Sequence, residues 1–153
     1  MPTEEQLKGV CHIMRRFVTQ KWGGTEAVVL NYSQGLSLLG IKNTIFSTDI
    51  FSDISHESIK DVDVYRHSYV FPWFGLSKAA KAKLCLKGGS PLSLSLFWHL
   101  LTKPQLSIIH THVQHRLGGM ARTVARLRGI PYVVSLHGNY LTLPKEQSEK
   151  MQE

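Results

Sequence analysis

The order of its secondary-structure signals constrains this chain most, because strand, helix and strand follow one another through short turns at both ends of the sequence. The first unit comprises Val10–Val18, a helix after Thr25, and Ile41–Thr48. The second unit comprises Leu106–Val113, Arg116–Arg128 and Tyr132–Leu136, which has the composition of a buried strand. Strands that alternate with helices in this way favour a parallel sheet with helices on both faces. We therefore predict an α/β fold with an open parallel sheet.

The ends of the two helices are marked by suitable residue types. Thr25 is a good N-cap, and Glu26 suits a first helical turn. Gly40 is placed to end the first helix in the left-handed conformation, and Gly129 stops the second. The apolar stripes expected to be buried repeat at helical spacing: Val29, Tyr32, Leu36 and Leu39 in the first helix, and Leu117, Met120, Val124 and Leu127 in the second.

The middle of the chain carries weaker signals. Asp61–Phe71 predicts a further strand, and Lys78–Leu86 predicts a basic helix. Gly88–Pro91 breaks the chain, and Pro91 suits the first turn of the next helix. That helix would carry Leu92, Leu96 and Leu100 on one side.

Composition places the chain among ordinary globular domains. Its 153 residues are 42% hydrophobic and 19% charged, which is enough apolar material for one core. The longest strongly apolar run, Leu92–Leu101, is too short and too polar to span a bilayer. Because the N-terminus lacks the regions of a signal peptide, we expect a cytoplasmic protein in which Cys11 and Cys85 are reduced, buried thiols.

Positive charge is concentrated in one long block. The formal net charge is +7, and no Asp or Glu occurs between Asp63 and Glu146, an interval that holds eleven Lys or Arg. Four lysines and four arginines form two clusters within it: Lys78, Lys81, Lys83 and Lys87, and Arg116, Arg122, Arg126 and Arg128. Such a block favours a phosphate-rich partner, namely nucleic acid, an anionic membrane or a phosphorylated small molecule. The alternative is a solvated basic face without a specific partner.

Three features fall at the carboxyl ends of predicted strands, where ligands bind in open parallel sheets. The first is Trp22–Glu26, with Gly23 and Gly24 before the first helix. Paired glycines let the backbone approach a ligand closely, and a helix N-terminus favours phosphate. This segment matches neither a dinucleotide-binding fingerprint nor a P-loop, so a tight turn that only needs glycine is the alternative.

The second feature is His110-Thr111-His112. On a strand, His110 and His112 project from the same face. Two histidines so placed suit zinc if a third ligand comes from His115 or His137, because the region lacks acids. Hydrogen-bonded structural histidines and ligand-contacting histidines are the alternatives.

The third feature is His137, which follows the last predicted strand and precedes Gly138. A histidine at the tip of such a strand is well placed to contact a substrate, since near neutral pH it donates to phosphate or accepts from a hydroxyl. A histidine that only caps the sheet edge is the alternative.

Taken in order, these features are similar to the N-terminal, acceptor-side domain of family 4 glycosyltransferases. The resemblance rests on the Gly-Gly-Thr-Glu loop, on Ile108–His112 and on the run from Ala125 to Gly138. It implies a Rossmann-like domain and the GT-B arrangement, in which two such domains face each other across a cleft. It also implies sugar transfer from a nucleotide-sugar donor, with retention of configuration, to a glycan or lipid-linked acceptor in polysaccharide biosynthesis.

The resemblance also assigns roles to individual residues. It places Gly23 and Gly24 near the donor diphosphate, His137 in the cleft near the transferred sugar as the catalytic candidate, and His112 on the acceptor side of the same cleft. It implies no cofactor and no essential metal. The aspartate that often precedes the Ile-Ile-His element is replaced here by Ser107.

The same resemblance predicts that residues 1–153 are a single, incomplete N-terminal domain with a polar tail over 143–153. The C-terminal donor-binding domain would then be absent, and the chain alone would be inactive unless a partner subunit supplies that half. The basic, aromatic segment Trp73–Leu101 suggests contact with the inner face of a membrane or with lipid-linked acceptors.

Two other functions remain open from the sequence. One is a non-catalytic module that binds phosphates or an anionic surface through its basic block, although no nucleic-acid motif is found and nucleic acid is not expected. The other is a small metal hydrolase that uses His110, His112 and His137.

Overall fold

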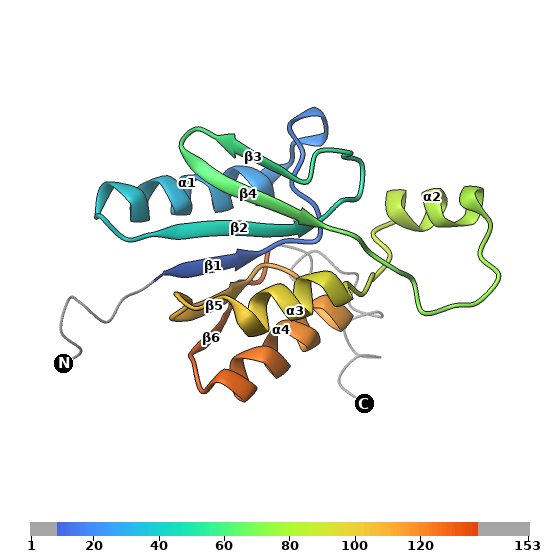
Figure 1. Cartoon of the computed structure of the whole chain (residues 1–153). Helices are drawn as coiled ribbons and strands as arrows, with labels where there is room; N and C mark the ends of the chain where they lie inside the picture. The colour runs from blue at the N-terminus through green and yellow to red at the C-terminus, as the bar shows by residue number, and fades with distance from the viewer. Residues whose placement is uncertain (1–8, 138–153) are drawn as a thin grey trace, which may run out of the picture.

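A six-stranded sheet with helices on both faces makes up the part of the chain that the computed structural model describes, residues 9–137 (Figure 1). The strands are β1 (Val10–Ile13), β2 (Asn43–Thr48), β3 (His56–Ile59), β4 (Val62–His67), β5 (Ile108–Thr111) and β6 (Tyr132–Val134). The helices are α1 (Gly24–Leu38), α2 (Lys78–Leu86), α3 (Leu94–Thr102) and α4 (His115–Arg128), with a 3-10 turn, η2 (Thr19–Lys21), before α1. In space the strands follow the order β3-β4-β2-β1-β5-β6.

β1 lies inside the sheet and pairs in parallel on both sides. His12 lies opposite Ile45 of β2 and opposite His110 of β5. The pairs β2–β4 and β5–β6 are also parallel, so the predicted Rossmann-like parallel sheet is confirmed. The strands are shorter than predicted, since β1 ends at Ile13 rather than Val18.

β3 is a strand that the sequence does not predict. It pairs antiparallel with β4 at the sheet edge. Between the two strands, Lys60 and Asp61 both have positive φ, 48° and 64°, as in two-residue hairpin turns that match the twist of the strands. The signal is missed because His56–Ile59 is polar and no glycine marks the turn.

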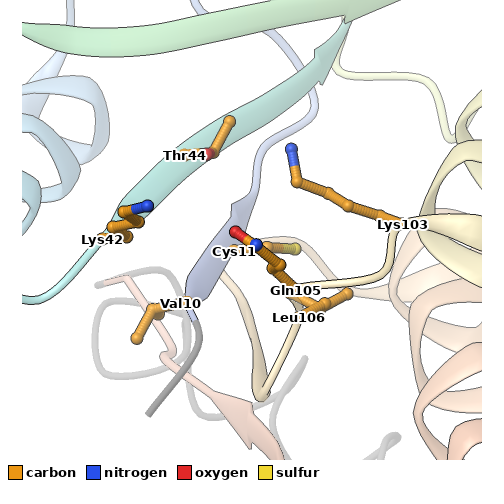
Figure 2. Close-up of a pocket in the computed structure, with 8 residues that line it drawn as sticks. Val10, Cys11, Lys42, Thr44, Lys103, Gln105 and Leu106 are labelled. Atoms are coloured by element: carbon orange, nitrogen blue, oxygen red, sulfur yellow. The ribbon is translucent and has the colours of Figure 1, made fainter. Parts of the chain in front are cut away.

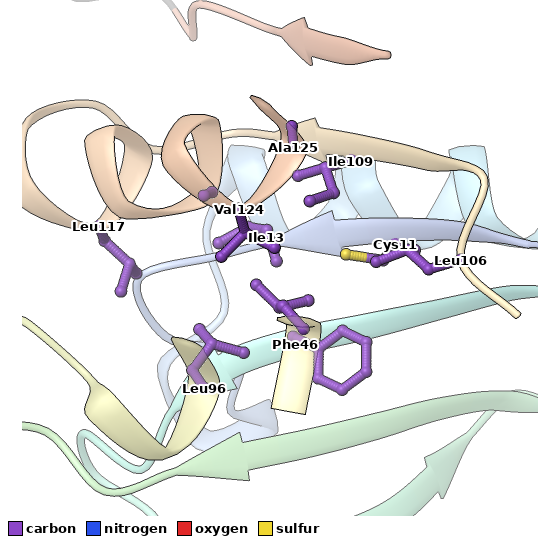
Figure 3. Close-up of a cluster of buried hydrophobic side chains, with 11 residues drawn as sticks. Cys11, Ile13, Phe46, Leu96, Leu106, Ile109, Leu117, Val124 and Ala125 are labelled. Atoms are coloured by element: carbon purple, nitrogen blue, oxygen red, sulfur yellow. The ribbon is translucent and has the colours of Figure 1, made fainter. Parts of the chain in front are cut away.

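Two hydrophobic clusters cover opposite faces of the sheet, because side chains alternate along each strand. Cys11 and Ile13 of β1 point toward α3 and α4, where they join a cluster with Phe46 and Ile109 (Figure 3). The cluster on the α1 side comprises Met14, Phe17, Val29, Leu30, Ile45, Val62 and Val64. Helices on both faces are therefore confirmed, and both cysteines are free and buried as expected.

α1 presents a different face to the sheet from the one predicted. Its buried residues are Glu26, Val29, Leu30 and Ser33. Tyr32 and Leu39 of the predicted stripe are instead 52% and 75% exposed. The face that turns inward is half polar: Val29 and Leu30 join the apolar cluster on that side, and Glu26 pairs with Arg16. The helix also begins at Gly24 with Gly23 as its N-cap, so the predicted Thr25 cap is wrong, whereas Gly40 follows the helix with a φ of 73° as expected.

α2 has the predicted bounds, but α3 begins later than expected. The Ser93 hydroxyl accepts a hydrogen bond from the Leu96 amide at 3.2 Å and caps α3. Leu92 is extended because its backbone pairs with Val70 in an isolated antiparallel bridge, so Pro91 does not start the helix. Within residues 9–137, no helix is long and apolar enough to cross a membrane.

α4 and β6 are more exposed than the sequence predicts. Gly129 ends α4 with a φ of 63°, as expected, but Leu127 is 64% exposed and Ala121 and Ala125 pack in the core. The predicted buried strand is the short edge strand β6, whose Val133 and Val134 are nearly half exposed. Its exposure follows from its place, since only β5 pairs with it in the described part of the chain.

Gly118 marks a close approach of α4 to the segment after β5. A β-carbon there would lie 2.4 Å from the carbonyl oxygen of Val113, whereas one at Gly119 would meet nothing within 4 Å. We expect Gly118→Ala to lower the free energy of unfolding by about 1–3 kcal/mol, because the backbone must shift. Gly119→Ala should raise it by about 0.5–1 kcal/mol through helix propensity. Urea unfolding measures both, and equal effects would contradict the close packing.

Candidate functional site

Histidines gather at the carboxyl ends of three neighbouring parallel strands. His12 belongs to β1 and His110 to β5, and the register places them opposite each other; His112 follows β5 and His137 follows β6. The ring centroids of His110 and His112 are 4.1 Å apart, and the His12 ring lies 5.2 Å and 5.3 Å from those two. These rings lie on the α1 face of the sheet, with Tyr32 nearby.

Hydrogen bonds join these histidines across the strands. His12 Nδ1 lies 3.1 Å from His112 Nε2, and His112 Nδ1 lies 2.9 Å from His137 Nε2. His110 Nε2 lies 2.7 Å from the hydroxyl of Ser135. The structure therefore brings together His112 and His137, two of the residues singled out in the sequence, and links both to β1.

Burial favours the neutral forms of His12, His110 and His112. It lowers the pKa of His12 to about 4, with help from the nearby His110. Burial is also the largest cause that lowers the pKa of His112, to about 3. His110, His12 and His137 add to this shift because they would repel a charge on that ring. The pKa of His110 is lowered by burial and by His137. Each neutral ring thus has one nitrogen with a lone pair, which can accept a hydrogen bond or bind a metal.

A pocket of about 380 Å³ opens beside the histidines, between the end of β1 and the start of α1. Its lining residues are Met14, Arg15, Arg16, Thr25, Glu26, His112 and Val113. Arg16 Nε lies 3.3 Å from a carboxylate oxygen of Glu26, which fixes the first turn of α1 against the chain after β1. Arg15 donates to the carbonyl oxygens of Cys85 and, at 3.0 Å, Gly89, so the pocket is also tied to the end of α2.

Gly23 and Gly24 lie at the N-terminus of α1, next to this pocket but outside its lining. A β-carbon at Gly24 would meet nothing within 4 Å, so the protein itself does not require glycine there. A β-carbon at Gly23 would come within 2.8 Å of a Glu26 carboxylate oxygen. Of the two glycines, Gly24 therefore leaves open space beside a helix N-terminus, where anions bind favourably.

Sequence reasoning missed His12, Arg15 and Arg16. The third histidine near His110 and His112 is His12, whereas His115 is exposed at the start of α4. One ligand atom from each of His12, His110 and His112 lies within 4.8 Å of the other two. The available signal was a lone polar residue in the apolar run of β1, and it gains meaning only when the register places it opposite His110.

A second pocket lies at the opposite ends of the strands (Figure 2). It measures about 140 Å³ and is lined by Cys11, Thr44 and Lys103 among others. Burial raises the pKa of the Cys11 thiol, which keeps it protonated and unreactive. The Lys103 ammonium lies 4.9 Å from the centre of the Phe46 ring, with which it makes a cation–π contact. This pocket lies at the amino ends, away from the edge where parallel sheets bind ligands.

These observations define a Rossmann-like α/β domain whose polar side chains and larger pocket lie at the carboxyl ends of its parallel strands. The glycosyl transferase 4-like domain family matches residues 23–152, which is most of the chain. The chain belongs to this family, and the resemblance seen in the sequence is confirmed. No curated protein matches the chain.

Protonation of the buried histidines couples folding to pH. Unfolded histidine binds its proton near pH 6.5, whereas native His12 and His112 bind theirs only near pH 4 and pH 3. Between these limits the unfolded state binds more protons, so the stability present above pH 6.5 is lost on acidification. The loss is at most about 1.4 kcal/mol per pH unit for each histidine, and less for His112, which partly contacts solvent.

Urea unfolding between pH 7.5 and 4 measures this effect. We expect His112→Asn to make the fall in stability with pH shallower. The matched control is His115→Asn, which removes an exposed histidine at a positive φ of 61° that asparagine tolerates, and it should keep the wild-type slope. Identical slopes for the wild type and His112→Asn would contradict the prediction.

Proposed function

We propose that this domain forms the acceptor-side half of a retaining glycosyltransferase, which moves a sugar from a nucleotide-sugar donor to a glycan or lipid-linked acceptor. The observation that carries the proposal is the position of the histidine pair His112–His137. It lies beside a basic pocket at the carboxyl ends of the strands, in a chain of the glycosyl transferase 4-like family.

The departing group in such a transfer is a nucleoside diphosphate, and the pocket suits its negative charge. Arg15 and Arg16 line one wall, and the N-terminus of α1 lies beside them. Fixed positive charge and backbone amides that already point at the leaving group stabilise the charge that develops on it. In this proposal Gly23 and Gly24 lie near the diphosphate, and the protein's own charges serve the transfer without an essential metal.

His137 would contact the transferred sugar, with His112 as its positioning residue on the acceptor side. When Nδ1–H of His112 donates to Nε2 of His137, the other ring nitrogen of His137 carries a proton and can donate to a sugar or phosphate oxygen. On its other ring nitrogen, His112 is held by the hydrogen bond with His12. A ring nitrogen oriented by the His112–His137 hydrogen bond thus meets the substrate as a donor.

The proposed reaction needs a second domain that faces this cleft and holds the nucleotide. We propose that a donor-binding domain or a partner subunit supplies it, and that the present domain does not turn over by itself. Half of the diphosphate site would still be present here, so nucleoside diphosphates should bind weakly to the chain.

Gly24→Ala tests the diphosphate site. The added β-carbon meets no protein atom within 4 Å, so stability should be kept while the approach of a diphosphate is blocked. We expect the dissociation constants of uridine or guanosine diphosphate to rise about tenfold or more in isothermal titration. Gly35→Ala is the matched control, since it lies in the same helix with the same open surroundings and should bind as the wild type does.

The result that would overturn the diphosphate site is equal binding by wild type, Gly24→Ala and Gly35→Ala. Absence of binding by the wild type would do the same. With the donor-binding half added, release of nucleoside diphosphate from a panel of nucleotide sugars should fall in His137→Ala to a greater extent than donor binding falls.

We also propose that the domain binds an anionic membrane surface through α2 and the loop before it. Trp73 and Phe74 are exposed in that loop, and the Arg116 guanidinium lies 4.8 Å from the centre of the Trp73 ring. The four lysines of the helix segment, Lys78, Lys81, Lys83 and Lys87, are all exposed. Exposed aromatic residues beside lysines favour the interface of a negatively charged bilayer, which would place lipid-linked acceptors close to the pocket.

Vesicle flotation tests this surface. We expect Lys78→Glu/Lys81→Glu to reduce binding to phosphatidylglycerol vesicles at least roughly tenfold, given about 1 kcal/mol per lysine. The double variant Lys42→Glu/Lys60→Glu makes the same change of charge at exposed positions outside α2 and should bind more strongly than the first variant. Equal loss in both variants, or equal binding to neutral vesicles, would contradict a specific membrane surface.

A further inference from the structure

We infer that His12, His110 and His112 form a binding site for a transition-metal ion of the zinc class. This site goes beyond the proposed sugar transfer, which needs no metal. One ring nitrogen from each residue lies within 4.8 Å of the other two. His12 Nδ1 and His112 Nε2 are 3.1 Å apart, and a bound ion would replace the hydrogen bond between them. Two ligands of a tetrahedral zinc ion are about 3.3 Å apart when both bonds are about 2.0–2.1 Å.

The backbone fixes this arrangement. His12 and His110 are register partners on adjacent parallel strands, and His112 lies two residues further along on the same face. A cluster that depends on strand pairing differs from a chance meeting of surface side chains, because its members have little freedom to move apart. The widest separation, up to 4.8 Å, would have to contract by as much as about 1.5 Å for all three nitrogens to bind one tetrahedral ion.

Outer hydrogen bonds orient two of the rings. His110 Nε2 is bonded to the Ser135 hydroxyl and His112 Nδ1 to His137 Nε2. This pattern leaves His110 Nδ1 and His112 Nε2 as the nitrogens that face the cluster. Metal-binding histidines in proteins almost always have such an outer partner, which fixes the tautomer and the orientation of the ring.

His12 supplies a second, independent observation. It is 1% exposed, and its Nε2 has no hydrogen-bond partner within residues 9–137. A buried imidazole that serves only packing normally has both ring nitrogens satisfied. His12 Nε2 is therefore free to carry the proton of the neutral ring, which leaves the lone pair of Nδ1, the nitrogen that faces His112, for a metal ion.

The donor set selects the metal. All three ligands are imidazoles, which suit zinc, copper and nickel rather than magnesium or calcium. His112 also lines the pocket of about 380 Å³, which gives the ion a path inward and leaves a coordination position for water or an anion.

Zinc titration of the full chain, without a histidine tag, tests the site. We expect one Zn²⁺ per chain with a dissociation constant in the micromolar range or below, and no comparable binding of Mg²⁺. His110→Ala removes the least buried ligand and should weaken zinc binding about 100-fold or more. His115→Asn, which removes an exposed histidine outside the cluster, should leave zinc affinity unchanged.

Two further measurements keep the test decisive if a variant folds poorly. Cobalt(II) bound to the wild type should give the visible spectrum of nitrogen ligation without the thiolate band that Cys11 or Cys85 would add. Zinc should also shift the ring nitrogen resonances of three histidines in the wild type. Binding only at millimolar zinc, full affinity in His110→Ala or a thiolate cobalt spectrum would each overturn the inference. Diphosphate titrations in the presence of a chelator keep this result separate from the proposed transfer.

Discussion

The parallel pairing of β1 with both β2 and β5 is the interaction on which the rest of the structure depends. It divides the side chains of β1 between the two faces of the sheet. Cys11 and Ile13 enter the apolar cluster under α3 and α4, and His12 faces α1. The same register aligns His12 with His110. One strand of four residues thus contributes to the core and positions the polar site, so changes in its register would disturb both.

α1 turns a face that is only partly apolar toward the sheet. A helix over a wholly apolar sheet would bury its largest apolar stripe, but α1 buries Glu26 and Ser33 with Val29 and Leu30 and leaves Tyr32 largely exposed. Glu26 pairs with Arg16 at the pocket, and Tyr32 lies near His110 and His112. The orientation of α1 therefore departs from the simple rule that the most apolar face turns inward, and it brings Glu26 to the pocket.

The sequence predicts elements with strong local signals and fails where neighbours decide. The basic helix α2 and the glycines after α1 and α4 could be predicted because composition and left-handed turns are local properties. The hairpin strand β3, the inward face of α1 and the edge exposure of β6 depend on what lies beside them. His112 and His137 could be placed at strand ends from the sequence, but their contact depends on the pairing of β5 with β6. His12 has no visible role until the β1–β5 register is known.

The site combines basic arginines with neutral histidines, and the two kinds of side chain can interact with different groups of a ligand. Arg15 and Arg16 line the pocket, whereas burial lowers the pKa of His12 and His112 and keeps those two rings neutral. Arg15 also joins the pocket to the C-terminal end of α2, and Tyr69 bonds to Cys85 on the buried side of that helix. Arg15 therefore joins the end of α2 to the pocket that His112 also lines.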